Sequence, residues 1–426
     1  MRILIINTDY PAFLRQHYGR NPELKDKSFD EQLAARNASF FGVFDAYSKA
    51  FESHGHHAIE VHANNGLLQR CYMVERGHPP PPVPPPSKSR LVRKASSVSA
   101  RIMNLMMNRI PFLRFYRPTL TSPFGIAPWR LSDILVSQVE EFRPDVILNQ
   151  SVSEIRSELL LRLKPYTKLI VGQIASPLPE REDYRAYDLM ISSLPNFVEY
   201  YRNRGIRSEL NRLGFDRRVL ETIGSPPRDV DVTFVGSLSP AHPERAQLIS
   251  WLAEQTRLDI WGNGVKQFPA KSPINLHYHG EVWGADMFRV LARSKITINN
   301  HIGIAGNYAN NMRLYEATGM GCLLITDKKA NIAEIFEPGR EIVCYSSKEE
   351  CLELIRYYST HEAERSAIAA AGQRRALEEH SYIARTSELA RLFESCLAGA
   401  EQPGRRIVKA DARHGETAFP HGSGSR

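Results

Sequence analysis

A short stretch near residue 310 brings together residue types that can bind an anion and a ribose. Asn310 and Asn311 precede a predicted helix that carries Arg313 and Glu316. Either asparagine can cap this helix, which leaves free N–H groups and the positive end of the helix dipole at its start. Arg313 and Glu316 are three residues apart and so lie on neighbouring helix surface. A guanidinium beside a diphosphate and a carboxylate accepting from ribose hydroxyls would suit a sugar nucleotide, whereas an exposed ion pair would contribute little.

Glycines follow several predicted strands in the second half of the chain. Glycine at a strand exit lets the backbone approach a ligand, and the amides that start the next helix form an anion site. One such exit more often only makes a turn, but successive exits favour a ligand-binding edge. The residues expected at this edge are Gly236, Ser237, Gly262, Asn263, His279 and Gly280. Arg245, in the helix after Gly236, is a second candidate for compensating a diphosphate, unless it is a plain helix-surface arginine.

Two further side chains follow strands and are candidates for the chemistry itself. Asp9 follows the first strand, "RILIIN", and is the best placed carboxylate in the first half of the chain for a general base. Its alternative role is to cap a loop. His301 follows the strand "KITINN" and is expected to face the same crevice.

Composition excludes several classes of protein. The chain has 426 residues, enough for two domains, and its hydrophobic and charged shares of 42% and 24% are those of a soluble globular protein. Its 5 cysteines are scattered without a C-x-x-C pair, so neither a disulfide framework nor a zinc knuckle is indicated. No run approaches the ~20 apolar residues of a membrane-spanning helix, and the N-terminus lacks signal-peptide features. A cytoplasmic location is the simplest expectation.

The positive charge is concentrated in one segment. The formal net charge is +8. Residues 76–132 contain ten Lys and Arg and no Asp or Glu, so the rest of the chain carries 8 − 10 = −2. The segment begins with a proline-rich stretch, which favours an extended spacer. It continues with bases interleaved with Ile, Met, Leu and Phe, which suits an anionic membrane surface or a charged acceptor. The alternative is a solvated loop followed by a core helix.

The hydrophobic pattern alternates between strands and helices in two successive series. The first includes a helix predicted over 38–56, and the second includes a strand predicted over 275–282 and a helix capped by Ser346 with Glu349. Strands separated by helices imply a parallel, doubly wound sheet. We predict an α/β fold of two tandem doubly wound Rossmann-like domains facing a cleft: an N-terminal domain over 1–222 with an insertion at about 76–132, a C-terminal domain over 229–380, a helix over 381–398 and a disordered tail over 399–426.

The stretch "NNMRLYEATGMGCLLITD", with the helical region that follows it, resembles the C-terminal domain of GT-B glycosyltransferases, and in particular the branch of CgeB-like spore-maturation proteins with a group 1-type domain. The similarity runs from about Asp231 to His380. It implies a nucleotide-sugar donor in the C-terminal domain, an acceptor in the N-terminal domain, no cofactor or metal, and a last helix that crosses back onto the first domain.

Glu316 matches the second glutamate of the family's E-x7-E pattern, which binds the donor ribose. The first glutamate, which contacts the donor sugar, would fall at position 308, where this chain has Tyr308. The resemblance therefore leaves retention and inversion of the anomeric centre open. Without a metal, charge on the departing diphosphate would be stabilised by arginines and helix N-termini.

Three hypotheses for function follow. The first is a cytoplasmic glycosyltransferase that moves a sugar to a glycan, lipid-linked or protein acceptor. In this hypothesis the 76–132 segment allows a peripheral contact with the inner face of the membrane. The second is a nucleotide-sugar epimerase on the same fold. The third is a non-catalytic, degenerate transferase that binds a polyanion, which Tyr308 favours. Nucleic-acid binding is not indicated, because no known reader motif is present.

Overall fold

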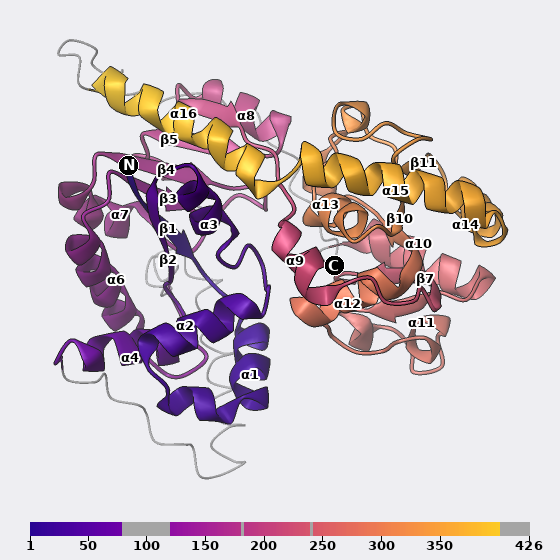
Figure 1. The fold of residues 1–426 in the computed structure, drawn as a ribbon, viewed down its shortest axis with the longest axis horizontal. Helices are drawn as coiled ribbons and strands as arrows, with labels where there is room; N and C mark the ends of the chain where they lie inside the picture. The colour runs from indigo at the N-terminus through magenta and orange to yellow at the C-terminus, as the bar shows by residue number, and fades with distance from the viewer. Residues whose placement is uncertain (79–119, 180–182, 239–241, 401–426) are drawn as a thin grey trace, which may run out of the picture.

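A computed structural model describes residues 1–78, 120–179, 183–238 and 242–400 of the chain. Within these ranges the strands form two sheets, and every recorded strand pair is parallel (Figure 1). The predicted α/β class with doubly wound sheets is confirmed. The predicted insertion falls largely outside the described residues, over 79–119, and so does most of the predicted tail, over 401–426.

The first sheet has the strand order β2-β1-β3-β4-β5-β6. Its central strands are fully buried, as expected for a parallel sheet covered by helices on both faces. Its strands are β1 (Arg2–Asn7), β2 (His57–His62), β3 (Val146–Asn149), β4 (Leu169–Gln173), β5 (Leu189–Ser192) and β6 (Ser208–Leu210). The helices of this half are α1 (Pro11–Arg20), α2 (Phe29–Ala38), α3 (Ala46–Ser53), α4 (Gly66–Glu75), α6 (Pro128–Phe142), α7 (Ser157–Leu163), α8 (Pro195–Arg202) and α9 (Arg217–Ile223).

The second sheet has the order β11-β10-β9-β7-β8, so the strand order reverses between β9 and β7. In an open α/β sheet, ligands bind outside the carboxyl ends of the strands at such a switch point. Its strands are β7 (Val230–Val235), β8 (Asp259–Trp261), β9 (Ser294–Asn299), β10 (Leu323–Asp327) and β11 (Val343–Tyr345). The helices are α10 (Pro243–Gln255), α11 (Pro273–Leu276), α12 (Ala285–Arg293), α13 (Met312–Gly319), α14 (Lys348–Thr360), α15 (Glu362–Glu378) and α16 (Tyr382–Ala400).

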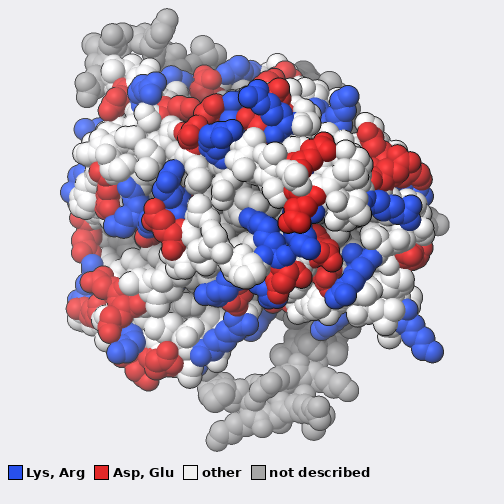
Figure 2. All heavy atoms as spheres, turned by 45° about the vertical axis from the view of Figure 1, so that its right-hand side comes forward, with Lys and Arg blue, Asp and Glu red and all other residues white. Residues whose placement is uncertain are grey.

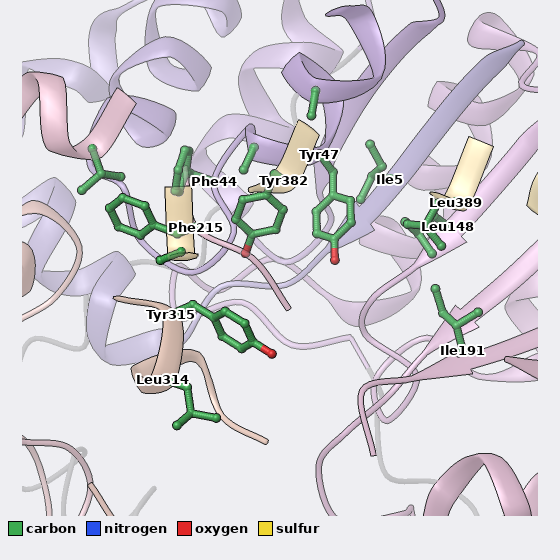
Figure 3. Packing of buried hydrophobic residues seen from close by; sticks show 14 of the residues in the cluster. Ile5, Phe44, Tyr47, Leu148, Ile191, Phe215, Leu314, Tyr315, Tyr382 and Leu389 are labelled. Atoms are coloured by element: carbon green, nitrogen blue, oxygen red, sulfur yellow. The ribbon is translucent and has the colours of Figure 1, made fainter. Parts of the chain in front are cut away.

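The two halves of the chain share one hydrophobic core. Helix α16 runs back over the first sheet and packs against α3 and β4 (Figure 1). Tyr47 of α3 lies beside Tyr382 of α16, with ring centroids 5.0 Å apart, and Tyr315 of α13 belongs to the same buried cluster (Figure 3). Phe215 and Leu314 extend it on the side of the second sheet. The carboxyl edges of the two sheets are therefore held in a defined relation to each other.

A second contact joins the halves at residues 283–286, just before and at the start of α12. The Ala285 amide donates to the Ser39 carbonyl at 2.8 Å, and Arg20 pairs with Asp286 at 2.5 Å. Gly284 has a φ of +54°, and a Cβ atom built on it would lie 2.0 Å from the Ser39 oxygen. Glycine is therefore required here by both conformation and space.

Replacing Gly284 with alanine is expected to lower the free energy of unfolding by at least about 1–2 kcal/mol. A positive φ is unfavourable for alanine, and its Cβ atom would also displace Ser39. Denaturant unfolding of the full chain measures this loss. Gly303 is the matched control, since a Cβ atom at that position would meet no atom within 4 Å and its φ is not positive. An equal loss for Gly303→Ala would contradict the role of the close approach.

Three local predictions are wrong. The helix predicted over 38–56 begins only at Ala46, because Phe40 and Phe44 have positive φ values of 54° and 36° and their rings turn into the shared core. The strand predicted over 275–282 is replaced by α11 and a single bridge from Tyr278 to Ile260. The cap of α14 is Ser347 instead of Ser346. Tertiary packing overrides local pattern in the first two cases.

No helix in the described ranges is long and apolar enough to cross a membrane. On the face drawn in Figure 2, basic and acidic side chains are interspersed instead of gathering into one patch. Eight of the ten basic residues of the 76–132 segment lie at 79–119, outside the described part of the chain.

Candidate functional site

Arg245 reaches over the switch point of the second sheet from α10. Its Nη2 donates to the Asn300 carbonyl at 2.7 Å, and its Nη1 donates to the Ser237 carbonyl at 3.3 Å. These two carbonyls follow β9 and β7, so the side chain bridges the two strand exits. Burial lowers the pKa of the guanidinium, and Asp327 opposes this. Because the side chain is bonded to both strand exits, the plain surface arginine considered above is excluded.

Asn311 caps α13, as one of the two predicted asparagines was expected to do. Its Oδ1 accepts from the Leu314 amide at 3.1 Å, and its Nδ2 donates to Asn299 Oδ1 at 2.8 Å. The start of the helix is thereby tied to the end of β9. Asn310 is buried beside it.

Arg313 and Glu316 face each other on α13. Arg313 Nη1 lies 3.0 Å from Glu316 Oε2, and Nη2 lies 3.2 Å from the Met287 sulfur of α12. The side chains are only 13% and 10% exposed, so the alternative of a solvated surface pair is wrong. Although the two charges are close, Nε and Nη1 of Arg313 make no hydrogen bond of acceptable geometry within the described residues. Burial raises the pKa of Glu316, and Arg313 opposes this.

His301 is held by Asp327 at the end of β10. The ring Nδ1 lies 2.6 Å from Asp327 Oδ1, which also accepts from the His301 amide at 3.0 Å. A carboxylate can only accept, so Nδ1 carries a proton in this contact. Burial alone would raise the pKa of Asp327, but His301 and then Lys329 outweigh it and lower the pKa. The catalytic role of His301 stays a prediction.

Asp9 is enclosed at the end of β1. Its carboxylate pairs with Arg36 of α2 and lies 3.5 Å from His62 Nδ1, and all three side chains are almost fully buried. Burial alone would raise the pKa of Asp9, but Arg36 and His62 hold it well below its ordinary value. In this arrangement Asp9 is an ion-pair partner instead of an open carboxylate, and its role as general base stays a prediction.

The predicted glycines pack against one another. The Gly262 amide donates to the Gly280 carbonyl at 3.0 Å, and a Cβ atom on Gly262 would lie 1.8 Å from the Gly236 oxygen. The Asn263 carbonyl accepts from the Leu238 amide at 2.9 Å. These contacts align the exits of β7 and β8, so the immediate use of glycine here is backbone-to-backbone packing.

His279 lies at the same end of the sheet. Its ring stacks on Trp261, with centroids 4.5 Å apart, and its Nε2 is 2.7 Å from Asp259 Oδ1. The side chain remains 45% exposed. It therefore provides a partly open aromatic surface beside the glycine exits.

A cavity of about 600 Å³ opens at the exits of β9, β10 and β11. Its volume lies within the range of ligand sites. It is lined by Leu248, Asn300, Asn307, Asp327, Lys328, Lys329, Ala330, Tyr345, Ser346, Ser347 and Lys348. None of the predicted donor residues lines this cavity, although Arg245 contacts Asn300 in its wall. Asp327 and the two lysines after it could have been predicted from the sequence, because they follow the apolar strand "LLIT" and so lie at the carboxyl edge of the sheet.

Two stretches that look like metal motifs have other partners. Asp229 and Asp231 of the D-x-D sequence pair with Arg293 at 2.6 Å and Lys295 at 2.7 Å. His54, in the sequence "HGHH", contacts the Ile383 carbonyl. Within the described residues, no group of three or more His, Cys, Asp and Glu side chains is arranged to hold a metal.

Several solved structures share this fold over almost the whole chain. A glycosyltransferase from Rickettsia africae aligns with a TM-score of 0.51 at 11% identity, over 93% of this chain and 98% of that one. Sucrose-phosphate synthase from Thermosynechococcus elongatus aligns at 0.52 and 10% identity, over 94% and 100%. Anabaena HepE in complex with UDP-glucose aligns at 0.52 and 14% identity, over 93% and 100%. This chain has the GT-B fold.

The GT-B assignment agrees with a match in sequence. Residues 245–391 match the model of a family described as glycosyl transferase-like. That range begins at Arg245 and includes Arg313 and Glu316. This match supports the prediction of a glycosyltransferase for the second half of the chain, whereas the CgeB-like branch stays a prediction. No curated protein matches this GT-B chain in sequence.

Proposed function

We propose that this protein transfers a sugar from a nucleotide-sugar donor held by its second half to an acceptor held by its first half. The observation that carries the proposal is that Arg245 and the capped start of α13, which bears Arg313, both contact the end of β9 at the switch point of the second sheet. Two guanidiniums and a helix N-terminus form a site for a diphosphate. The UDP-glucose complex of HepE, which has the same fold, supports a nucleotide sugar as the ligand.

Donor binding would exchange partners within the Arg313–Glu316 pair. Glu316 would accept from the ribose hydroxyls, as the resemblance implies, and Arg313 would turn its unused N–H groups to the phosphates. The present 3.0 Å contact holds both groups ready at the site. The bound diphosphate would replace the negative charge that Arg313 now faces.

During the transfer, negative charge develops on the departing nucleoside diphosphate, and the protein must stabilise it. We propose that Arg245, Arg313 and the N-terminus of α13 supply this stabilisation without a metal, because fixed positive groups need no reorganisation as the charge develops. His301, oriented by Asp327, remains the candidate closest to this edge for moving a proton. The acceptor would be a glycan, a lipid-linked sugar or a protein, and we place the reaction in the cytoplasm.

Tyr308 sets this protein apart from the family pattern. Its side chain packs with the apolar cluster around Val152, Ile174 and Tyr184 of the first half, so it contributes to the contact between the halves. A tyrosine in this packing does not replace a sugar-binding carboxylate. This observation favours, as a second candidate, a protein that binds a nucleotide sugar without transferring it. Release of nucleotide from the donor would exclude that candidate.

A thermal-shift panel of UDP, GDP, ADP and CMP sugars, with chelator present, tests the donor proposal. A donor at 100 times its Kd stabilises the folded chain by about 2.7 kcal/mol, so one nucleotide class is expected to raise the melting temperature. Arg245→Gln is expected to remove the shift. The matched control is Arg257→Gln, because Arg257 follows the same helix and is 77% exposed. Failure of every nucleotide to shift the wild type, or equal losses in both variants, would contradict the proposal.

A further inference from the structure

A second cavity lies at the contact between the two halves of the chain, and neither Arg245 nor Arg313 lines it. Its volume is about 130 Å³, and it lies between α1 and the start of α12. One water needs about 10–15 Å³ of such space, so the cavity has room for roughly ten heavy atoms, about one sugar ring. Its lining residues are Phe13, Gln16, His17, Arg20, Asn21, Ser39, Trp283, Ala285 and Asp286.

One wall of this cavity is aromatic. The Phe13 ring stacks on Phe41 with centroids 3.9 Å apart, and His17 stacks on Phe13 at 5.5 Å. Trp283 packs edge-on against Phe41 at 5.5 Å from the other half of the chain. Flat apolar surface with a few fixed polar groups is typical of small-molecule sites.

His17 provides a polar atom that the fold leaves unused. The side chain is more than nine-tenths buried, and its Nε2 makes no hydrogen bond within the described residues. Burial and then the Arg36 charge lower the pKa of His17, so the ring is neutral at pH 7. A buried polar atom without a partner costs free energy. This nitrogen exposes less than 1 Å², so a ligand in the cavity would reach it only after the His17 ring turns.

The charged side chains at the rim of the cavity are already paired with one another. Arg20 is already paired with Asp286 at 2.5 Å, and Asp286 pairs with Arg289 as well. Asn21 and Gln16 add uncharged donors and acceptors. A neutral molecule rich in hydroxyl groups therefore fits the lining better than a phosphate or a carboxylate.

The cavity also lies between a segment of the first half of the chain and a segment of the second half. The Ser39 carbonyl in its wall ends the helix that carries Arg36, the partner of Asp9. From Ala285, α12 continues to Met287, which touches Arg313. A ligand in the cavity would therefore contact both the segment that encloses Asp9 and the segment that positions the arginine pair.

We propose that this cavity binds one sugar ring of the acceptor, which makes the acceptor a glycan or another glycoside. The inference rests on the proposed sugar transfer, because it assigns the second substrate of that reaction. Both halves of the chain build the cavity, so the acceptor is bound only when they are in contact. Trp283 would contact the acceptor through ring stacking, and Gln16 would contact it through a hydrogen bond.

Saturation-transfer NMR on the full chain, with the methyl glycosides of glucose, galactose, mannose and N-acetylglucosamine at up to about 50 mM, tests this proposal, since single-ring contacts correspond to millimolar Kd values. At least one glycoside is expected to bind the wild type. Trp283→Ala and Gln16→Ala are each expected to weaken binding by about tenfold. Trp251→Ala is the matched control, because Trp251 is similarly half-buried but lies on α10, under Lys348.

Absence of binding by every glycoside, or equal binding by the Trp283→Ala and Trp251→Ala variants, would overturn the proposal. Gln16→Ala gives a second readout, should loss of Trp283 disturb the fold. The experiment needs no nucleotide. Failure of the donor proposal would appear in the thermal-shift panel alone, and failure of the acceptor site would appear in the NMR alone.

Discussion

Replacing Asp9 with asparagine is expected to lower the free energy of unfolding by about 3–5 kcal/mol, because it leaves the Arg36 guanidinium buried without its counter-charge. Both side chains are at most 3% exposed, so solvent screens the pair very little. Denaturant unfolding of the full chain measures the loss. Asp133→Asn is the matched control, since Asp133 also pairs with an arginine, at 2.7 Å, but is 51% exposed. That control is expected to cost less than about 1 kcal/mol.

The loss of stability caused by Asp9→Asn is expected to depend on pH. Because the pKa of Asp9 is lowered in the folded chain, its ionised form stabilises the fold. This contribution is complete above the ordinary aspartate pKa of about 4 and is lost as the pH falls below it. The difference in stability between wild type and Asp9→Asn should therefore be constant at neutral pH and shrink in acid. A difference that grows on acidification would show that the carboxylate is not held in its ionised form.

Replacing Glu316 with alanine is expected to weaken donor binding by at least about 100-fold. A carboxylate that accepts from two ribose hydroxyls makes hydrogen bonds worth about 1.5–3 kcal/mol each, and tenfold in Kd corresponds to about 1.4 kcal/mol. Calorimetric titration with the nucleotide sugar found in the thermal-shift panel measures the change. Unfolding is followed in parallel, since the substitution also leaves Arg313 without its partner.

Glu388→Ala is the control for this prediction. Arg385 and Glu388 have the same order and spacing on α16, with a 3.0 Å contact, but Glu388 is 54% exposed and lies on a different helix from the site. Donor binding by this variant is expected to match the wild type. Unchanged binding by Glu316→Ala would remove Glu316 from the site while leaving Arg245 to be tested separately.

The strands and the arginine-bearing helix could be predicted because their signals are local. Buried parallel strands appear as continuous apolar runs, and the cap of α13 lies next to the helix that it begins. The partner of Asp9 was not predictable in this way. Arg36 lies 27 residues further along the chain, and its pairing depends on the tertiary contacts that bring α2 to Asp9.

The contact between the halves was missed for a related reason. Ser39 and Gly284 are separated by most of the chain, and nothing near either residue indicates the other. Phe40 and Phe44 were interpreted as one face of a helix, because their spacing fits a helical period as well as it fits the irregular segment that they form. The smaller cavity depends on such long-range contacts, so its walls were found only in the structure.

The core around Tyr47, Tyr315 and Tyr382 belongs to neither half alone. Because the two halves share this core, neither sheet can unfold without exposing buried residues of the other. The chain should therefore unfold on heating as one cooperative unit. Any nucleotide that tightens the second half would then also protect the first half from proteolysis, although it touches none of its residues.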